Sequence, residues 1–372
     1  MDSRIRITFV INNLGGGGAE RVLLNILNNL DRNRFKPKLF LFEYEGEYLK
    51  ELLPDVEIGY STDKEIISNN KISKLIRVPM KYLKRCTIGV KKLREFSKGD
   101  DIVVAFLEKM ITYNVSRAIK NEKKISYAWL HNNAKEFSKI HKILSHKYYK
   151  TYDKIFCVSN ECTELAKKQF ENIANKIETI YNPIEIQNII DKANKKIEFN
   201  FPEGRNIVAT GRLTHQKGFD ILIEAFNKIK YTDTNLIILG EGEDRFKLEQ
   251  LIEKYNLKDR VYIPGFVENP FAILKKADLF ILSSRYEGLP TVLIEALILN
   301  KNIISTKCSG STEILENGKY GELVDINDID GLRKKIEYVL ENKIESNGIC
   351  KAKEFDIKNI MNKLETKLLN GL

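Results

Sequence analysis

Residues 277–282 (ADLFIL) form an apolar run, residues 283–286 (SSRY) a polar turn, and residues 287–295 (EGLPTVLIE) begin and end with a glutamate. The apolar run predicts a buried strand, and Gly288 and Pro290 interrupt it before a helix begins at Thr291. The first N–H groups of a helix lack helical partners, so this turn favours a bound anion. Carboxylates accept hydrogen bonds from hydroxyl groups, so Glu287 and Glu295 predict contacts to two hydroxyl-rich parts of one ligand. A phosphate between two hydroxyl-rich groups is the outline of a nucleotide sugar.

Strand–helix alternation occurs twice along the 372-residue chain, which predicts an α/β protein of two domains. The expected strands are 5–11, 38–42, 101–106, 125–130 and 154–158, then 206–210, 236–239, 261–263, 279–282, 302–305 and 321–324. The turn Tyr181-Asn182-Pro183 ends the first run, and a polar stretch at 191–200 predicts a linker helix. Two such runs predict two doubly wound, Rossmann-like parallel sheets that face each other across an interdomain cleft.

A glycine-rich loop, residues 12–20 (NNLGGGGAE), follows the first expected strand. Its glycines let the backbone pass close to a ligand, and a helix expected from Ala19 would favour phosphate. The loop is not a GxGxxG motif, and no acidic residue closes the second strand as a dinucleotide site requires. Taken alone, the loop is equally consistent with a flexible turn.

A second loop, residues 210–220 (TGRLTHQKGFD), places two cations around a strand-to-helix turn. Arg212 offers a planar fork and Lys217 a point charge, so both can converge on one diphosphate. The alternative is a pair of surface cations, and in either case both side chains are expected to face solvent. His215, between the two cations, is expected to be a neutral loop residue.

Three further candidates carry weaker signals. His131, in the loop 129–133 (WLHNN), either bonds a sugar hydroxyl or is a structural histidine. Asp328 and Asp330 resemble a metal-binding DxD pair, but their position before a helix favours a helix start. The glycine turn 239–242 (LGEG) either lines a bound nucleotide or is simply a tight turn.

Composition and charge indicate where the protein acts and what kind of surface it contacts. No apolar run reaches the roughly 18 residues that span a bilayer, no signal peptide is expected, and five scattered cysteines with four histidines predict neither disulfides nor zinc. The whole positive excess lies in residues 1–183, where the segment 71–98 carries ten basic residues and one acid among recurring apolar ones, including Leu93 and Phe96. This amphipathic pattern predicts an anionic membrane surface as partner, or simply a solvated helix face, whereas nucleic acid is disfavoured. A cytoplasmic protein, peripheral on the inner face of the plasma membrane, is expected.

An ordered set of motifs resembles a known family. Gly211-Arg212-Leu213 with Lys217-Gly218 comes first, followed by Leu239-Gly240-Glu241-Gly242, Gly265-Phe266, and Glu287-Gly288-Leu289-Pro290 with Glu295. Together they resemble the retaining glycosyltransferases of family 4, which have the GT-B fold of two facing Rossmann-like domains. The loop ending in Gly-Ala-Glu-Arg and the His131 loop fit as well. The resemblance covers nearly the whole chain and is strongest from 205 to 325.

The family implies an acceptor-side domain at 1–183 and a donor domain at 184–354, with a helix at about 355–372 packing back on the first domain. The donor residues that it implies are Gly17, Gly18, Gly211, Arg212, Lys217, Val267, Glu287, Gly288, Leu289, Thr291, Val292 and Glu295. It assigns catalytic roles to Glu287, His131, Arg212 and Lys217.

The resemblance implies transfer of a hexose or N-acetylhexosamine from a nucleoside diphosphate sugar, UDP-linked by expectation, with retention at the anomeric carbon. The acceptor is expected to be a glycan, lipid-linked through polyprenyl diphosphate, in surface polysaccharide or glycoprotein glycan synthesis. No cofactor or metal is expected, because two cations and a helix N-terminus can neutralise the leaving diphosphate. A non-hydrolysing nucleotide-sugar epimerase and a non-catalytic nucleotide-sugar-binding protein are the alternatives.

Overall fold

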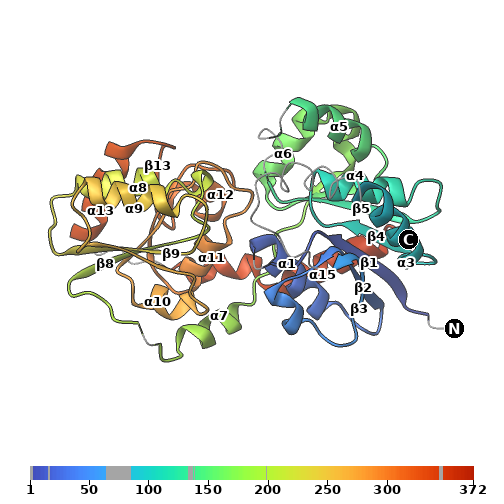
Figure 1. Cartoon of the computed structure of the whole chain (residues 1–372), viewed down its shortest axis with the longest axis horizontal. Coiled ribbons are helices and arrows are strands. Elements are labelled where there is room, and N and C mark those ends of the chain that lie inside the picture. Colours follow the sequence, from blue (N-terminus) through green and yellow to red (C-terminus); the bar gives the residue numbers. More distant parts are fainter. Residues whose placement is uncertain are drawn as a thin grey trace. The chain divides into compact units, whose positions relative to one another are not determined.

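The computed structural model describes residues 3–15, 17–63, 85–132, 137, 139–197, 199–342 and 347–372. The chain divides into two compact units (Figure 1). Met1–Pro183 and Ile357–Leu372 make up the N-terminal unit, and Ile184–Asp356 make up the C-terminal unit. Each unit contains one parallel sheet, which confirms the predicted pair of Rossmann-like α/β domains. The cleft expected between them stays a prediction.

The N-terminal unit is built on a seven-stranded sheet. Its strand order is β3 (Glu57–Asp63), β2 (Phe35–Tyr44), β1 (Ile5–Ile11), β4 (Ile102–Ala105), β5 (Ile125–Leu130), β6 (Lys154–Cys157) and β7 (Ile177–Thr179). Its helices are α1 (Gly18–Asn29), α3 (Val90–Phe96), α4 (Met110–Ala118), α5 (Lys139–Tyr149), α6 (Asn160–Gln169) and α15 (Ile357–Leu369). The strand order reverses direction between β1 and β4, so the loops after these two strands meet at a switch point, where such sheets bind ligands.

Two different cores cover the two faces of this sheet. One face is packed with aliphatic and aromatic side chains from the strands and from the helices that cover it, such as Leu93, Val115 and Tyr149. The other face carries aromatic rings at Phe9, Phe106, Trp129 and Phe156, whose successive centroids lie 6.2, 4.7 and 5.3 Å apart. Alternation along each strand sends neighbouring residues to opposite faces, which explains the two separate sets.

Helix α15 returns from the far end of the chain to the N-terminal unit. Its Glu365 carboxylate accepts a hydrogen bond from the Asp31 N–H (2.9 Å), and its Lys367 forms an ion pair with Glu178. The Tyr127 hydroxyl donates to the Lys367 carbonyl (3.5 Å). These contacts join residues that lie more than 180 positions apart in the sequence.

The C-terminal unit is built on a six-stranded sheet. Its strand order is β10 (Val261–Gly265), β9 (Thr234–Leu239), β8 (Arg205–Thr210), β11 (Leu279–Leu282), β12 (Asn302–Thr306) and β13 (Glu322–Val324). Its helices are α7 (Ile186–Ala193), α8 (Phe219–Asn227), α9 (Arg245–Lys254), α10 (Pro270–Lys276), α11 (Thr291–Ile298), α12 (Ser311–Ile314), α13 (Ile329–Glu341) and α14 (Gly348–Ala352). The switch point lies between β8 and β11, so the loops that follow them are neighbours.

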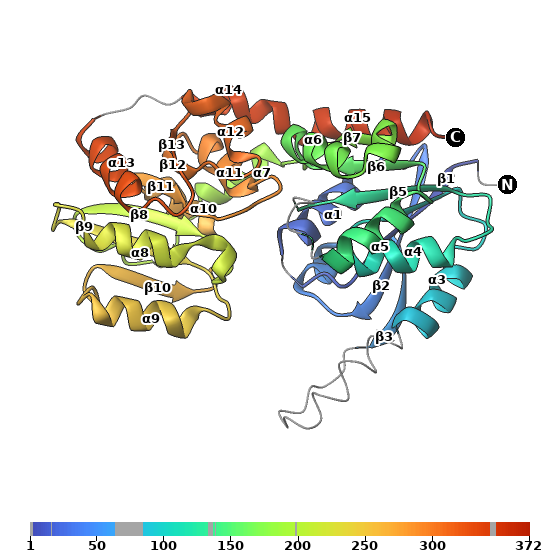
Figure 2. The same cartoon turned by 90° about the horizontal axis from the view of Figure 1, so that it is seen from above.

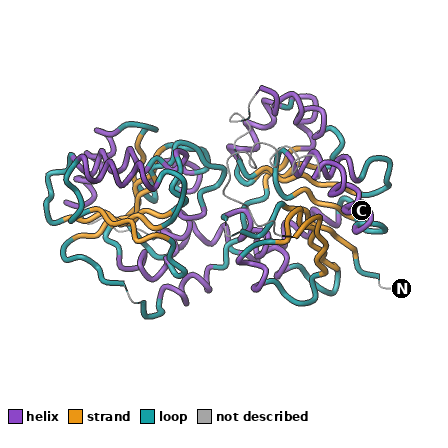
Figure 3. The backbone as a smooth tube through the Cα atoms, viewed as in Figure 1, coloured by secondary structure: helices purple, strands orange, loops and turns teal. Residues whose placement is uncertain are grey.

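Helices cover both faces of the second sheet (Figures 2 and 3). Helix α8 packs against α9 and α13 on one face, while α7 packs against α10 and α11 on the other. Chain direction explains this division, because right-handed crossovers put the helices of the two halves of such a sheet on opposite faces.

Three local predictions differ from the structure. Strands β3 and β7 were not expected, because β3 is only partly buried and β7 has three residues. The bounds predicted for the linker helix, 191–200, are wrong: α7 spans Ile186–Ala193, so it shares only 191–193 with the predicted stretch. Its Ile189 and Ala193 are buried, so packing placed this helix upstream of the polar residues.

The basic segment 71–98 is only partly described, and residues 71–84 lie outside the described residues. Arg85–Gly89 form a π-helical turn and α3 follows. Leu93 is fully buried and Phe96 packs against the core, so these two apolar residues of the segment belong to the protein interior. The membrane insertion predicted for Ile72, Leu75, Ile76, Tyr82 and Leu83 lies outside the described residues. The described part of the segment looks amphipathic in sequence because α3 packs its apolar side against the protein and exposes its basic side.

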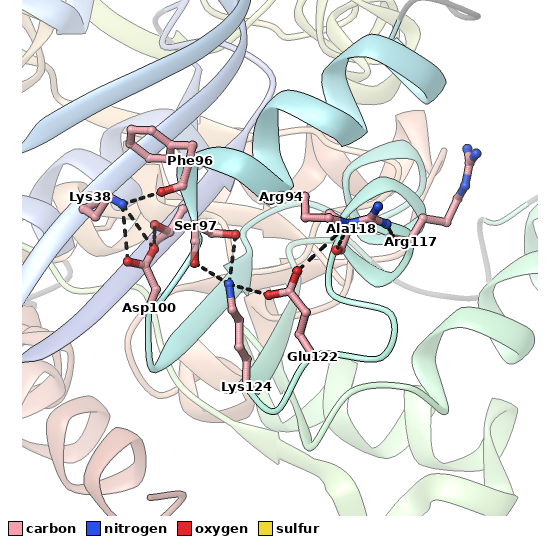
Figure 4. Close-up of polar contacts among 10 residues, drawn as sticks. Lys38, Arg94, Phe96, Ser97, Asp100, Arg117, Ala118, Glu122 and Lys124 are labelled. Atoms are coloured by element: carbon pink, nitrogen blue, oxygen red, sulfur yellow. Dashed lines mark hydrogen bonds and ion pairs between the residues drawn. The ribbon is translucent and has the colours of Figure 1, made fainter.

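Buried cations hold the C-terminal end of α3 in place (Figure 4). The Lys38 ammonium donates to the Phe96 carbonyl (2.6 Å) and lies 3.3 Å from Asp100 Oδ1. The Lys124 ammonium donates to the Ser97 carbonyl and lies 2.7 Å from Glu122. Positive charge at a helix C-terminus satisfies its last carbonyls and complements its dipole.

None of the helices in the described part of the chain has the length and apolar character needed to cross a bilayer.

Candidate functional site

Three glycine-containing loops lie side by side at the carboxyl edge of the C-terminal sheet. The Gly211 N–H donates to the Leu239 carbonyl (3.0 Å), and the Gly240 N–H donates to the Gly265 carbonyl (2.9 Å). Gly240 has a φ of 144°, and a Cβ there would lie 2.0 Å from the Gly211 carbonyl oxygen. Only glycine permits this approach, so the loops after β8, β9 and β10 form a continuous backbone surface.

Lys217 and Glu287 meet across the loops that follow β8 and β11. The Lys217 ammonium lies 2.6 Å from Glu287 Oε1, and the Ser284 hydroxyl donates to the same oxygen (2.6 Å). The two side chains are only 19% and 10% exposed. The expectation that both loop cations face solvent is therefore wrong for Lys217, because its charge is partnered by a glutamate 70 positions away.

Arg212 differs from Lys217 in this respect. It is exposed, and no ion pair links it to any residue of the described part. Its guanidinium is therefore available for an anion at the carboxyl end of β8, as expected for a diphosphate ligand.

The turn before α11 lies beside the Lys217–Glu287 pair. Gly288 and Leu289 are buried, whereas Thr291 and Val292 are half-buried in the first turn of the helix. In the first turn of α11, the Leu293 N–H donates to the Pro290 carbonyl (3.0 Å). The preceding N–H groups belong to the helix N-terminus, where an anion is favoured.

Two other predicted contacts lie on the same edge. Glu295 is half-buried in the second turn of α11, where it has partners within the protein. Val267 is half-buried after β10, next to Phe266, which is 76% exposed. Single exposed apolar side chains are common on protein surfaces, so the exposure of Phe266 does not by itself assign a ligand to this corner.

The first helix of the N-terminal unit begins one residue earlier than expected. Gly17 is the N-cap of α1 and Gly18 its first residue. A Cβ at Gly18 would meet no atom within 4 Å, whereas one at Gly17 would lie 2.3 Å from the Glu20 carboxylate. The backbone at Gly18 is therefore open to a ligand.

His131 directly follows β5 and lies beside two rings of the aromatic face of the sheet. Its ring centroid is 4.8 Å from that of Phe106 and 6.2 Å from that of Trp129. Burial lowers the pKa of His131 from its ordinary value to about 4, although the nearby Glu108 carboxylate and a hydrogen bond with the Phe106 backbone act in the opposite direction. The imidazole is therefore neutral at physiological pH, and its shielded Nε2 has no hydrogen-bond partner among the residues that the structure describes.

Glu108 holds the His131 loop, and sequence reasoning missed it. Its carboxylate accepts hydrogen bonds from the His131 N–H (3.2 Å) and the Asn132 amide (2.5 Å), and the residue is 8% exposed. The only available signal was an acidic residue shortly after a buried strand. Next to it, Lys109 has a φ of 62°, which is uncommon for a non-glycine residue.

Asp328 and Asp330 begin a helix, as predicted. The Asp328 carboxylate accepts a hydrogen bond from the Gly331 N–H (2.8 Å), and Asp330 lies 3.1 Å from Lys228. Across the described ranges no three His, Cys, Asp or Glu side chains gather as a metal-ligand set.

Comparison with known proteins adds relatives and a family. The sequence profile described as "Glycosyl transferases group 1" matches residues 191–354. An uncharacterized glycosyltransferase of Methanocaldococcus jannaschii is 34% identical, over 89% of this chain and 94% of the relative. A second relative, from Campylobacter jejuni, is 29% identical over 94% of this chain and 96% of its own length. It is named N-acetylgalactosamine-N,N'-diacetylbacillosaminyl-diphospho-undecaprenol 4-alpha-N-acetylgalactosaminyltransferase.

Solved structures share the fold. Anabaena HepE in complex with UDP has a TM-score of 0.77 at 19% identity, over 98% of this chain and all of that one. The sucrose-phosphate synthase of Thermosynechococcus elongatus has a TM-score of 0.80 at 15% identity, over 99% of this chain and all of that one. At these identities the likeness concerns the GT-B architecture of two Rossmann-like domains.

Proposed function

The chain belongs to the group 1 glycosyltransferases, and from this membership we propose that it moves a hexose or N-acetylhexosamine from a UDP-sugar to a lipid-linked glycan. The observation that carries the proposal is the grouping of Arg212, Lys217, Glu287 and the N-terminus of α11 at the carboxyl ends of adjacent strands. Two cations and a helix N-terminus suit a diphosphate, and a carboxylate suits sugar hydroxyls.

Each donor group has a distinct role in this proposal. Arg212 and Lys217 bind the diphosphate together with the N–H groups of Thr291 and Val292, with Gly17, Gly18 and Gly211 contributing backbone. Glu287, Gly288 and Leu289 contact the sugar, Glu295 the ribose and the Val267 corner the base, while His131 contacts the sugar. UDP as the carrier is supported by the UDP complex of HepE, which shares the fold.

The proposed reaction retains the anomeric configuration and uses no metal. Charge develops on the leaving diphosphate in the transition state, and fixed cations and helix N–H groups stabilise it there. The neutral His131 imidazole cannot offset phosphate charge, and a hydroxyl reaches its shielded Nε2 only after the groups that cover it have moved.

A polyprenyl-diphosphate-linked acceptor at an anionic membrane completes the proposal. One support is the name of the Campylobacter relative, which specifies a diphospho-undecaprenol substrate. The other is a set of exposed basic residues in α3 and the turn after it, Lys91, Arg94 and Lys98. Cationic side chains near an anionic leaflet each contribute roughly 1 kcal/mol.

Incubation with a panel of UDP-sugars and a polyprenyl-diphosphate-linked acceptor tests the proposal. We expect label to move from one donor to the lipid fraction, with an α-linkage formed from an α-linked donor by NMR. Interconversion of the donor without transfer would indicate an epimerase instead, and binding without either reaction a nucleotide-sugar-binding protein.

A further inference from the structure

Arg285 lies between Ser284 and Glu287 in the loop after β11, and its guanidinium bonds to other groups of the protein. Nη1 and Nη2 lie 2.9 and 2.7 Å from the two carboxylate oxygens of Asp220. Nη1 also donates to the His215 carbonyl (2.7 Å), and Nε donates to Asn327 Oδ1 (3.0 Å). The side chain is 13% exposed, and its guanidinium is already bonded to groups of the protein, in contrast to that of Arg212.

The bidentate pair spans the two loops that supply the donor cation and carboxylate. Arg285 stands two residues before Glu287, and Asp220 stands three residues after Lys217 in the first turn of α8. Around the pair, the Arg285 N–H donates to the Gln216 carbonyl (2.8 Å), and the Gln216 amide donates to the Tyr286 carbonyl (2.9 Å). Arg285 and Asp220 thus tie the two loops together beside the site.

Gly218 shows how closely these loops must approach. Its φ is 62°, and a Cβ there would lie 2.2 Å from the Ser283 carbonyl oxygen. The Ser283 hydroxyl in turn donates to the Lys217 carbonyl (2.9 Å). A small separation of the loops would therefore displace Lys217 relative to Glu287.

Donor binding removes one of the existing ties. A phosphate competes with Glu287 for the Lys217 ammonium, and a sugar hydroxyl competes with Lys217 for the carboxylate, so the 2.6 Å ion pair is weakened when the site fills. The remaining cross-loop contacts are neutral apart from the Arg285–Asp220 pair. Burial opposes ionisation of Asp220, but hydrogen bonds from Arg285 outweigh it and hold its pKa below the usual value, so the pair stays charged at neutral pH.

We propose that Arg285 and Asp220 are positioning residues that keep Lys217 and Glu287 in register while the nucleotide sugar is bound, an inference that rests on the proposed function. Neither residue touches the substrate. Their contacts hold the two loops together. This matters because an error of about 1 Å in the position of a reacting group can cost about a hundredfold in rate.

A double-mutant cycle with a matched control tests this role. The variants are Arg285→Lys, Asp220→Asn and both together; the control is Arg205→Lys with Asp233→Asn, an Arg–Asp pair at the opposite edge of the same sheet (2.5 Å). Calorimetry with UDP gives the dissociation constant, donor-dependent kinetics give KM and kcat, and circular dichroism gives Tm.

We expect each single variant to weaken UDP binding and raise the donor KM about tenfold at temperatures well below its Tm, and the double variant to be no worse than either. The control variants should bind UDP within about twofold of the wild type, because their pair is remote from the site. Asp220→Asn provides the second measurement should Arg285→Lys fail to fold.

Two outcomes would overturn the inference in different ways. Wild-type UDP affinity in the folded variants, with only a lower Tm, would make the pair a stabilising contact and overturn the positioning role alone. A wild-type protein that binds no nucleoside diphosphate would overturn the proposed function and the positioning role with it.

Discussion

The carboxyl edges of the two sheets are built differently. In the C-terminal unit, charged groups are held against one another: Lys217 pairs with Glu287, and Arg285 pairs with Asp220. In the N-terminal unit, the corresponding edge has an open glycine at the start of α1 and a neutral, shielded histidine. An edge that stabilises a diphosphate needs fixed charge, whereas one that receives a hydroxyl needs a neutral acceptor and room. The following predictions test whether this contrast is functional.

The largest effect is expected for the two cations of the C-terminal edge. Lys217→Ala and Arg212→Ala should each lower kcat/KM by an amount equal to about 2–4 kcal/mol, the value of one lost contact to developing charge. The two should differ in stability, because Lys217 is largely buried against Glu287 and Arg212 is exposed. Thermal unfolding should therefore register Lys217→Ala, at about 1–3 kcal/mol, and leave Arg212→Ala unchanged. Activity within about threefold of wild type for both variants would contradict the diphosphate role.

The two glutamates of the same edge are expected to differ in the kinetic parameter that they affect. Glu287→Gln removes negative charge near the reacting carbon, so it should chiefly lower kcat. Glu295→Gln acts on the ribose, away from bond breaking, so it should chiefly raise the donor KM. Donor-dependent kinetics of both variants decide this, and the reverse pattern would exchange their roles.

The shielded histidine of the N-terminal unit predicts a specific pH response. Burial lowers the folded-state pKa of His131 to about 4, against about 6.5 in the unfolded chain. Between these values the unfolded state binds more protons, so the contribution is fully present above pH 6.5 and is lost as the pH falls towards 4. His131→Gln should remove this part of the acid destabilisation, as seen in Tm measured from pH 7 to pH 4. An unchanged acid response in the variant would place the titration elsewhere.

A smaller effect is expected for the exposed basic residues of α3 and the turn after it. Lys91→Gln with Lys98→Gln should weaken binding to vesicles containing anionic lipid and slow transfer to a lipid acceptor, since each cation contributes roughly 1 kcal/mol. Transfer to a short soluble acceptor should be spared, because both side chains are exposed and the fold does not need them. Loss of both reactions would point to a folding defect, and unchanged sedimentation with vesicles would leave α3 a solvated face.

No effect is expected from chelation. Activity should survive EDTA, because Arg212, Lys217 and the α11 N-terminus are proposed to supply the positive charge that a metal would otherwise provide. Loss of activity with EDTA that Mn²⁺ or Mg²⁺ restores would reject this, and it would reopen the question of which carboxylates bind the ion.

Much of the fold could be predicted because it depends on local patterns. The expected strands at Ile5–Ile11, Ile125–Leu130 and Leu279–Leu282 match the observed bounds, since each is a buried apolar run ended by polar residues. Strands β3 and β7 and the position of α7 could not be predicted, because partial burial and short length leave little periodicity to detect.

The sequence by itself determined the α/β class, the two sheets, and the glycine-containing loops at the strand ends, because hydrophobic periodicity and glycine positions are local properties. Only the tertiary structure decided which charges are paired. Lys217 and Arg212 look equivalent in sequence, yet one meets Glu287 and the other does not. The hydrogen bond between Glu108 and the His131 N–H, and the burial of Leu93 and Phe96, were likewise decided by the tertiary structure. Such contacts join residues far apart in the chain, so they follow from strand order and packing, which no local pattern encodes.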